Sequence, residues 1–381
     1  MRVLHVITGL GIGGAEQQLR LLLRHLPVTS EVVTLTNPGA VARGIEADGT
    51  PVTPLGMAGN RDLGALPRLV RLMRRGRYDL VHTHLYRACL YGRFAARLAG
   101  VRAVVATEHS LGEHQIEGRR LTAGTRALYL AGERLGTATV AVSPSVARRL
   151  ERWGVAASRI RVVPNGIETD RFRYTEDARR LTRKLLGLPG DAFVVGGVGR
   201  LTPGKRFDRL VRAVAAVPEA RLLLVGEGGE RERLLRTALG EGAAGRVVLH
   251  GACEDPPTAD SGAPDLPSLL AAMDVFVSTS PDETFGLAAV EALAAGLPVL
   301  HVACPAIDDL PPEAAPGARR IGGSVPEVIS ALRDVRDAPA ARFPQPEAAR
   351  RYDIAHSARQ LMSLYEQAVH GTPLPHEVRH P

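Results

Sequence analysis

Two basic residues lie in a glycine-rich segment of the second half of the chain, where they could bind phosphate. Arg200 and Lys205 stand five positions apart in GGVGRLTPGKR (196–206), and Lys205 is one of only two lysines in a chain whose basic residues are otherwise arginine. A guanidinium and an ammonium that converge on a diphosphate would stabilise it as a leaving group. The alternative is a solvated basic turn. A P-loop is excluded, because the GxxxxGK[ST] spacing and the hydroxyl after the lysine are missing.

A second cluster, STSPDETFGLAAVE (278–291), contains two acids eight positions apart. We expect Glu283 in a loop and Glu291 about one and a half turns into the helix that follows. Carboxylates at these places could bind different parts of a polyhydroxyl ligand, while amides at the start of the helix face its phosphates. An acid in so apolar a helix is costly to bury unless its oxygens have partners. The alternative is a capping Glu283 with a structural Glu291.

The first half opens with GLGIGG (9–14), which fits the GxGxxG pattern of dinucleotide-binding proteins. Glycines between a strand and a helix let the backbone approach a phosphate. However, the acid expected at the end of the second strand is missing, because that strand ends TLTNP (34–38) and Glu31 stands at its beginning. An NAD enzyme is therefore a weak alternative.

Histidines and cysteines were also considered as metal ligands. His82 and His84 alternate in the predicted strand VHTH, and because we expect no third ligand near them we interpret them as structural. The three cysteines lie far apart and form no CxxC pair, which argues against a zinc site and a disulfide framework. We therefore expect no metal and a reducing compartment.

These motifs must be positioned by alternating strands and helices, which are typical of parallel sheets in an α/β protein. With 381 residues the chain is long enough for two domains. Strands are predicted at 3–7, 31–35, 80–83, 103–107, 139–142 and 160–163, and then at 193–198, 222–225, 247–249, 275–278 and 298–302. The charged stretch with breaker residues at 164–190 is predicted to be a linker. The apolar residues Ile354, Ala358, Leu361, Leu364, Tyr365 and Ala368 indicate a closing helix.

The ordered set of motifs resembles the retaining glycosyltransferases of family-4 type (glycosyl transferases group 1). It comprises GGAE (13–16), TEHS (107–110), VSPSVARRL (142–150), VVPNGIETDRF (162–172), GVGRLTPGKRFDRLVRA (197–213), LLLVGEG (222–228), VVLHG (247–251) and ETFGLAAVEALAAGLPVL (283–300). The resemblance implies a GT-B fold, that is, two Rossmann-like doubly wound domains facing across a cleft. We place an acceptor-side domain at 1–168 and a nucleotide-sugar domain at 169–353, with the closing helix (354–370) packing back on the first domain.

The resemblance also implies roles for individual residues. Arg200 and Lys205 would hold the donor diphosphate, and Glu291 would bind the ribose hydroxyls. Glu283, Thr284 and the amides of Phe285, Gly286 and Leu287 would contact the donor sugar and phosphates. Gly13 and Gly14 would admit the diphosphate, and His109 would lie near the anomeric carbon and hydrogen-bond the sugar. The catalytic set implied is His109, Glu283, Arg200 and Lys205, with no cofactor beyond a UDP- or GDP-sugar as substrate.

The expected partners are the nucleotide sugar and a small-molecule, saccharide or lipid-linked acceptor, and not nucleic acid. Residues 1–170 hold 23 Lys/Arg against 13 Asp/Glu, whereas the rest of the chain is nearly neutral. The basic amphipathic stretch 63–77 could lie on anionic lipid, although such a helix more often packs on its own sheet. The N-terminus resembles no signal peptide, so we expect a cytoplasmic protein, and peripheral contact of its basic half with the inner face of the membrane stays an open alternative.

Two segments depart from the family pattern. Residues 252–265 form a longer connection rich in Pro and Asp, beside the place where the family binds the nucleotide base. Residues 301–310 (HVACPAIDDL) replace a glycine pair and Pro-Glu that border the donor sugar in the family. We expect acceptor contacts from 110–120 and from the loop around Asn60 and Arg61. A nucleotide-sugar epimerase, a sugar phosphorylase and an inactive nucleotide-sugar binding protein remain the alternatives.

Overall fold

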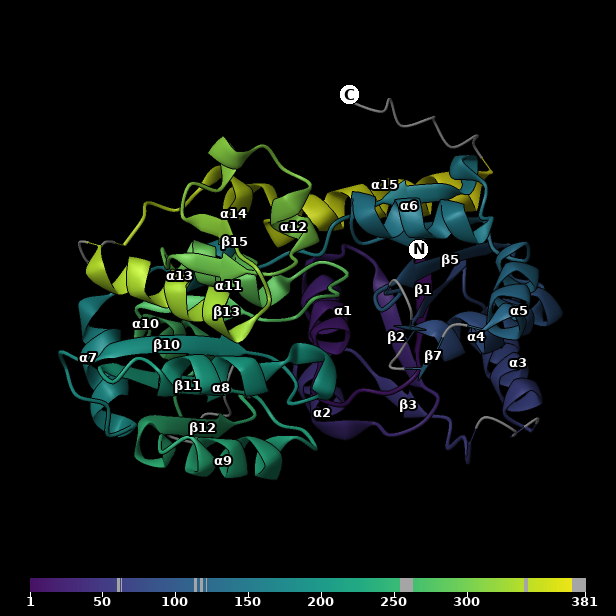
Figure 1. Cartoon of the computed structure of the whole chain (residues 1–381). Helices are drawn as coiled ribbons and strands as arrows, with labels where there is room; N and C mark the ends of the chain where they lie inside the picture. The colour runs from purple at the N-terminus through teal and green to yellow at the C-terminus, as the bar shows by residue number, and fades with distance from the viewer. Residues whose placement is uncertain are drawn as a thin grey trace. The chain divides into compact units, whose positions relative to one another are not determined.

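The computed structural model divides the chain into two compact units, each with its own parallel sheet (Figure 1). It describes residues 1–59, 62, 64–112, 115–116, 119–120, 122–253, 263–338 and 342–371, with side chains for all of these except 115, 119 and 120. Unit 1 is Met1–Gly166 with the C-terminal segment from Ile354, and unit 2 is Ile167–Asp353. The division falls two residues before the domain boundary expected at 168/169.

The described part of unit 1 contains a seven-stranded sheet in the order β3-β2-β1-β4-β5-β8-β9, in which every pairing is parallel. Its strands are β1 (Arg2–Ile7), β2 (Thr29–Thr34), β3 (Val52–Pro54), β4 (Leu80–His84), β5 (Ala103–Glu108), β8 (Ala138–Ala141) and β9 (Ile160–Val162). Its helices are α1 (Gly14–His25), α2 (Gly39–Ala47), α3 (Ala65–Gly76), α4 (Tyr86–Ala99), α5 (Ala123–Glu133), α6 (Pro144–Trp153) and α15 (Ile354–His370), with a 3-10 turn η1 (Ala157–Arg159). A short antiparallel pair, β6 (Gln115–Ile116) and β7 (Arg119–Arg120), stands apart from the sheet.

In its described residues, unit 2 has a six-stranded parallel sheet in the order β12-β11-β10-β13-β14-β15. Its strands are β10 (Phe193–Val198), β11 (Ala220–Val225), β12 (Val247–Gly251), β13 (Val275–Ser278), β14 (Val299–His301) and β15 (Ala318–Arg320). Its helices are α7 (Glu176–Leu185), α8 (Phe207–Ala215), α9 (Arg231–Gly240), α10 (Leu266–Ala271), α11 (Leu287–Ala294), α12 (Pro305–Asp308), α13 (Val325–Asp337) and α14 (Glu347–Arg351). The 3-10 turns are η2 (Thr169–Phe172), η3 (Pro203–Lys205), η4 (Ala244–Arg246) and η5 (Pro312–Ala314).

The prediction of an α/β protein with two Rossmann-like sheets is confirmed. Each predicted strand is present, with ends that differ by a few residues at most. In both sheets the strand order reverses beside the first strand, between β1 and β4 in unit 1 and between β10 and β13 in unit 2. Ligands of doubly wound proteins bind at such a reversal, at the carboxyl ends of the strands.

The stretch expected to be a linker is partly helical, so that prediction was wrong for its centre. The side chain of Thr175 accepts a hydrogen bond from the amide of Ala178 and caps α7, whose first turn is acidic and last turn basic. This charge order favours a helix, because acids stabilise the positive end of the helix dipole and bases the negative end. Arg179 and Arg183 of α7 also bind the carboxylate of Asp274, each at 2.7 Å.

Two amphipathic helices pack on the sheet of unit 1. The six apolar residues expected on one face of α15 are all buried, in a cluster with Val3, Leu80 and Val105, so the yellow end of the chain lies in the same unit as its purple beginning (Figure 1). The apolar face of α3 is likewise buried through Leu69 and Met73. The apolar face of α3 is therefore used inside unit 1, and contact of its arginines with anionic lipid stays a prediction. No helix among the described residues is long and apolar enough to cross a bilayer.

Candidate active site

In unit 2 the predicted site residues lie on the two loops that flank the reversal of strand order. Arg200 and Lys205 follow β10, and Glu283 follows β13. These two strands are hydrogen-bonded neighbours, so the loops leave the same edge of the sheet side by side. The parallel architecture thus brings together residues that are about 80 positions apart in the sequence.

The loop after β10 is held by the loop after β11 through closely approaching backbones. The amide of Gly199 donates to the carbonyl of Val225 at 2.9 Å, and the amide of Leu201 donates to the carbonyl of Glu227 at 2.8 Å. Gly226 has a φ of +143°, and a Cβ there would collide with the carbonyl of Gly199. A glycine is therefore needed for this approach, which leaves the Arg200 side chain on the exposed surface.

Lys205 and Glu283 form an ion pair between the two loops. The Lys205 ammonium donates to Glu283 Oε1 at 2.5 Å, and the exposed fractions of the two side chains are 28% and 15%. The hydroxyl of Thr279, just after β13, also donates to the backbone carbonyl of Lys205 at 2.8 Å. Two residues that were predicted separately from the sequence are thus in direct contact and partly exposed.

The loop from β13 leads into the start of α11. Thr284 lies on this loop, and the buried ring of Phe285 packs edge-on against Tyr352 with 5.0 Å between ring centroids. Gly286 takes the N-cap position with a φ of +100°, and Leu287 is the first helical residue. The amides of a first helical turn point toward the N-terminus, where they favour anionic groups. Glu291 lies in the second turn of α11 and is half-buried.

The divergent residues 301–310 pack directly against this loop. The Cys304 thiol donates to the carbonyl of Phe285 at 3.4 Å, and a Cβ on Gly286 would collide with its sulfur. Asp308 fixes the turn, because its carboxylate accepts from the amide of Cys304 at 2.8 Å and contacts His301 Nε2 at 3.1 Å. Burial opposes the anionic form of Asp308, but its hydrogen bonds to His301 and Cys304 lower its pKa below the ordinary value. This segment therefore shapes the α11 N-terminus, where the family would bind the donor.

In unit 1, Gly13 and Gly14 lie between β1 and α1, next to the other reversal of strand order. Gly13 is the N-cap of α1 in extended backbone, and Gly14 opens the helix. A Cβ on Gly13 would collide with the Glu16 side chain, which folds over this helix end. An anion that approached α1 here would meet the Glu16 carboxylate first.

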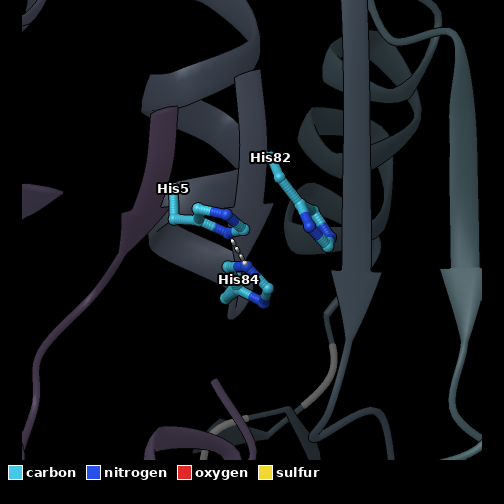
Figure 2. A group of neighbouring side chains, drawn as sticks. All are labelled: His5, His82 and His84. Carbon is cyan, nitrogen blue, oxygen red and sulfur yellow. Dashed lines mark hydrogen bonds between the residues drawn. The ribbon is translucent and has the colours of Figure 1, made fainter. Parts of the chain in front are cut away.

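His109 follows β5 in unit 1 and contacts a second histidine. Its Nε2 lies 3.2 Å from His84 Nδ1, and His84 Nε2 lies 3.3 Å from His5 Nδ1 (Figure 2 shows the second contact). Burial lowers the pKa of His109 to about 4 and that of His5 to about 3, because water is excluded from the charged forms. These rings are therefore neutral near pH 7.

His82 completes a cluster that the sequence did not reveal. The ligand atoms of His5, His82 and His84 lie within 4.8 Å of one another, a grouping that could hold a metal ion (Figure 2). The statement that His82 and His84 have no third histidine nearby was wrong, because His5 on β1 is in register with His82 on β4. Both nitrogens of His82 contact hydroxyls, Nδ1 with Tyr365 at 2.5 Å and Nε2 with Thr107 at 2.7 Å.

Some predicted segments fall partly or wholly outside the described residues. They are Asn60 and Arg61, parts of the expected acceptor segment 110–120, and residues 254–262 of the long connection 252–265. Among the predicted residues, Lys205 and Glu283 contact each other within unit 2, and His109 contacts His84 within unit 1. Cys304 and His5 were not singled out from the sequence. Only strand pairing identifies His5, since it lies alone within its strand.

The chain was compared with known proteins. The model of Glycosyltransferase Family 4 matches residues 12–171, and that of Glycosyl transferases group 1 matches residues 178–314. The chain is 30% identical over 350 residues to D-inositol 3-phosphate glycosyltransferase 1 of Catenulispora acidiphila. This match covers 84% of this chain and 80% of that enzyme.

Two further proteins are similar over different extents. The chain is 30% identical to the UDP-Gal:alpha-D-GlcNAc-diphosphoundecaprenol alpha-1,3-galactosyltransferase of Escherichia coli, over 63% of this chain and 62% of that enzyme, which is less than two thirds of its length. A crystal structure of Anabaena HepE with UDP-glucose superposes with a TM-score of 0.82 at 23% identity, over 96% of this chain and all of that one. The Catenulispora match extends along most of both chains, and one family model matches most of the first part of unit 1 while the other matches much of unit 2. This chain belongs to the glycosyl transferases group 1, of the family 4 type, and has their GT-B fold.

Proposed function

We propose that this glycosyltransferase moves a sugar from a nucleotide diphosphate to an acceptor hydroxyl with retention of the anomeric configuration and without a metal ion. We propose a UDP-sugar as donor, with a GDP-sugar as the alternative. The observation that carries the proposal is the contact of Lys205 with Glu283 beside the N-terminus of α11. A uridine donor is supported by the name of the Escherichia coli relative, a UDP-Gal-dependent galactosyltransferase, and by the UDP-glucose complex of the Anabaena protein.

The positive groups of unit 2 suit a leaving diphosphate. Lys205 and the exposed Arg200 lie on one loop, and the first turn of α11 adds amides with the positive end of a helix dipole. Such groups stabilise the negative charge that develops when a sugar–phosphate bond breaks. They would supply the charge that a divalent ion supplies elsewhere, so we expect EDTA to leave transfer unchanged.

The proposed step uses the leaving diphosphate as the base. The bond between the anomeric carbon and the phosphate oxygen breaks, and its electron pair stays with the diphosphate. The acceptor oxygen attacks the same face of the oxocarbenium-like sugar, and its proton passes to a phosphate oxygen. The products are the glycoside and the nucleoside diphosphate, so the step needs cations around the phosphate more than a carboxylate base.

The remaining site residues take positioning roles in this proposal. Glu283 and Thr284 would contact the donor sugar, and Glu291 the ribose. Gly13 and Gly14 would lie beside the diphosphate, and Glu16 would have to turn away from Gly13 when it binds. His109 would hydrogen-bond the reacting sugar as a neutral ring, since burial lowers its pKa to about 4.

The acceptor is proposed to be a small polyol, a saccharide or a lipid-linked sugar. The names of the two relatives point to different acceptors. The Catenulispora enzyme is named for an inositol phosphate, and the Escherichia coli enzyme for a diphosphoundecaprenol-linked sugar. Unit 1 would bind the acceptor, and its arginines would suit an anionic acceptor or a peripheral position at an anionic membrane surface.

A binding panel tests the donor directly. Thermal unfolding is measured with UDP-, GDP-, dTDP- and ADP-sugars and with the matching nucleoside diphosphates. We expect a uridine ligand, or failing that a guanosine ligand, to raise the unfolding temperature, because a ligand that binds only the folded state stabilises it. The proposal is wrong if no nucleoside diphosphate or nucleotide sugar shifts the transition.

The stabilising donor is then incubated alone, and its slow hydrolysis is followed by mass spectrometry and by proton NMR of the released sugar. Release of the sugar with the donor's anomeric configuration supports retention, and inversion contradicts it. Conversion of the donor into an isomeric nucleotide sugar would identify an epimerase instead. Release of a sugar phosphate on addition of inorganic phosphate would identify a phosphorylase.

A further inference from the structure

A line of side-chain contacts extends from Ser30 through two histidine rings to His109 in unit 1. The Ser30 hydroxyl lies 3.4 Å from His5 Nε2, His5 Nδ1 lies 3.3 Å from His84 Nε2, and His84 Nδ1 lies 3.2 Å from His109 Nε2. The register places these groups on one face, because His5 pairs with His82 and side chains two positions apart in a strand point the same way. The rings of His84 and of both its neighbours are close to parallel, at 20° and 28°.

All three rings are buried, with no more than 7% of any residue exposed. Burial lowers the pKa of each, and the neighbouring histidines lower that of His84 further. A neutral imidazole has one nitrogen that donates a hydrogen bond and one that accepts. A contact between two neutral rings therefore requires that one ring donates and the other accepts.

The contacts along the line are head to tail, because each joins the Nδ1 of one ring to the Nε2 of the next. If His5 carries its proton on Nδ1, it donates to His84 Nε2. His84 must then carry its own proton on Nδ1 and donate to His109 Nε2, which leaves the proton of His109 on Nδ1. If His5 carries its proton on Nε2, the same argument puts every proton on Nε2. The three rings must therefore share one tautomer.

We propose that His84, supported by His5, is a positioning residue that holds the neutral ring of His109 in a single tautomer. His109 then presents one fixed hydrogen-bonding role at Nδ1, the nitrogen that does not face His84. The role of that nitrogen toward the donor sugar rests on the proposed function, whereas the shared tautomer rests on the ring contacts alone. A wrong tautomer would place an N–H where a lone pair is needed, or the reverse.

The same cluster could be considered as a metal site, since three histidines lie within reach of one another. However, each nitrogen of His5 and His84 already contacts a partner in the line, and both nitrogens of His82 contact hydroxyls. A metal ion would have to break several of these contacts and enter a fully buried place. The hydrogen-bonded line uses both ring nitrogens of His5 and of His84 without such a loss.

His82 offers a matched control for His84. Both residues lie on β4 two positions apart, both are fully buried, and burial lowers the pKa of both. His84 contacts His109, whereas His82 contacts Tyr365 and Thr107. A change at His82 removes a buried histidine of the same strand without removing the partner of His109.

The first experiment measures the tautomers in the unmodified protein. The full chain is labelled with ¹⁵N in its histidine rings, and NMR identifies which nitrogen of each ring carries the proton, with single variants used for assignment. We expect His5, His84 and His109 to be neutral at pH 7.5 and to carry their protons on the same nitrogen. Mixed tautomers, a protonated ring, or one metal ion per chain bound to these rings in the purified protein would each overturn the proposal.

The second experiment compares His84→Asn with His84→Gln. The Asn amide lies near the position of Nδ1 and can still bond His109, whereas the Gln amide reaches the position of Nε2 and cannot. With the donor found by the binding panel, we expect His84→Gln to lower kcat about tenfold or more and His84→Asn to recover most of it. The KM for the donor should change little, because the proposed diphosphate and ribose contacts lie in unit 2.

The two His82 variants, His82→Asn and His82→Gln, serve as controls. They should lower thermal stability but leave kcat and the tautomer of His109 unchanged. Equal kcat for both His84 variants and the unmodified protein would overturn the positioning role. These outcomes are separate from the failure of the proposed function, since a chain that transfers no sugar still reports its tautomers by NMR.

Discussion

Lys205 and Glu283 hold each other where the donor phosphates are proposed to bind. Because the ammonium already contacts a carboxylate at 2.5 Å, an incoming diphosphate competes with Glu283 for it. The carboxylate could then turn to the sugar hydroxyls of the same ligand. The contact between Lys205 and Glu283 would thus be replaced by one contact of Lys205 with the diphosphate and one of Glu283 with the sugar. Neither charged group would be left without a partner when the donor binds.

Replacing Lys205 tests this role. We expect Lys205→Ala to lower kcat/KM for transfer by about 10²- to 10³-fold, because it removes a group aimed at the charge that develops on the leaving phosphate. The free energy of unfolding should fall by about 1 kcal/mol or less, since partly exposed ion pairs contribute little. Initial rates and urea unfolding measure the two effects.

Lys184 provides the matched control, because it is the only other lysine and lies exposed in the last turn of α7. Lys184→Ala should leave both transfer and stability unchanged. Unchanged turnover in Lys205→Ala would refute the diphosphate role. A large loss of stability in that variant would show that the pair is mainly structural.

The sequence singles out candidate site residues in unit 2 but does not show which of them contact each other. Arg200, Lys205 and Glu283 stand out by type and spacing, and strand order places their loops together. Whether Lys205 faces Glu283 or solvent depends on side-chain positions that spacing does not determine. His5 shows the same limit in unit 1, because a single histidine in an apolar strand acquires meaning only through its register with β4.

At the scale of elements, the turn into α11 depends on Gly286. Its φ of +100° lies in the region that side chains rarely adopt, and a Cβ there would also collide with Cys304 Sγ. We expect Gly286→Ala to lower the free energy of unfolding by about 1–2 kcal/mol, because alanine is unfavourable in this left-handed backbone conformation. The collision with Cys304 should lower it further. It should also weaken donor binding, because it shifts the first turn of α11. Urea unfolding by circular dichroism and donor titration measure these effects.

A double variant separates the two causes. The double variant Gly286→Ala/Cys304→Ala removes the collision but keeps the unfavourable backbone conformation. In the Cys304→Ala background, Gly286→Ala should therefore lower the free energy of unfolding by less than it does in the unmodified chain, but not by zero. Gly190→Ala is the control, since Gly190 has neither a positive φ nor a heavy atom within 4 Å of an added Cβ. It should change stability by about 0.5 kcal/mol or less. Full recovery in the double variant would contradict the backbone argument.

The strands of the two main sheets that the sequence does not predict are short and lie at sheet edges. Strands β3 and β15 have three residues each, lie at the edges of their sheets and lack a clear apolar alternation. Helix α7 was read as a linker because charges dominate it, although Thr175 and the order of its charges favour a helix. Local patterns identify long buried strands well, because burial on both faces imposes a continuous apolar run.

Across the whole chain, the two units differ in whether the polar side chains of their candidate sites are buried and neutral or partly exposed and charged. Unit 1 buries a cluster of neutral histidines, of which His82 contacts Tyr365 of α15, whereas Lys205 and Glu283 of unit 2 keep their charges partly exposed. The sequence indicated two α/β halves but could not show this difference, because it arises from which strands become neighbours. It should be visible in how the stability of unit 1 depends on pH.

Unit 1 should lose stability as the pH falls. The unfolded chain binds a proton at each histidine near pH 6.5, but folded His109 and His5 do so only near pH 4 and pH 3, because burial opposes their charged forms. Between these values the unfolded state binds more protons, so stability is complete above pH 6.5 and falls as the pH decreases toward 4. The slope should reach about 1.4 kcal/mol per pH unit for each extra proton.

Trp153 makes the measurement specific, because it is the only tryptophan and lies in α6 of unit 1. Urea unfolding followed by its fluorescence should give lower stability at pH 5 than at pH 7.5. His5→Asn should be less stable at pH 7.5 but should show a smaller pH slope, since one buried titrating ring is gone. His356→Asn, at an exposed position of α15, should keep the full slope. If His5→Asn and the unmodified chain lose stability equally between these pH values, carboxylates and not the buried histidines determine the acid sensitivity of unit 1.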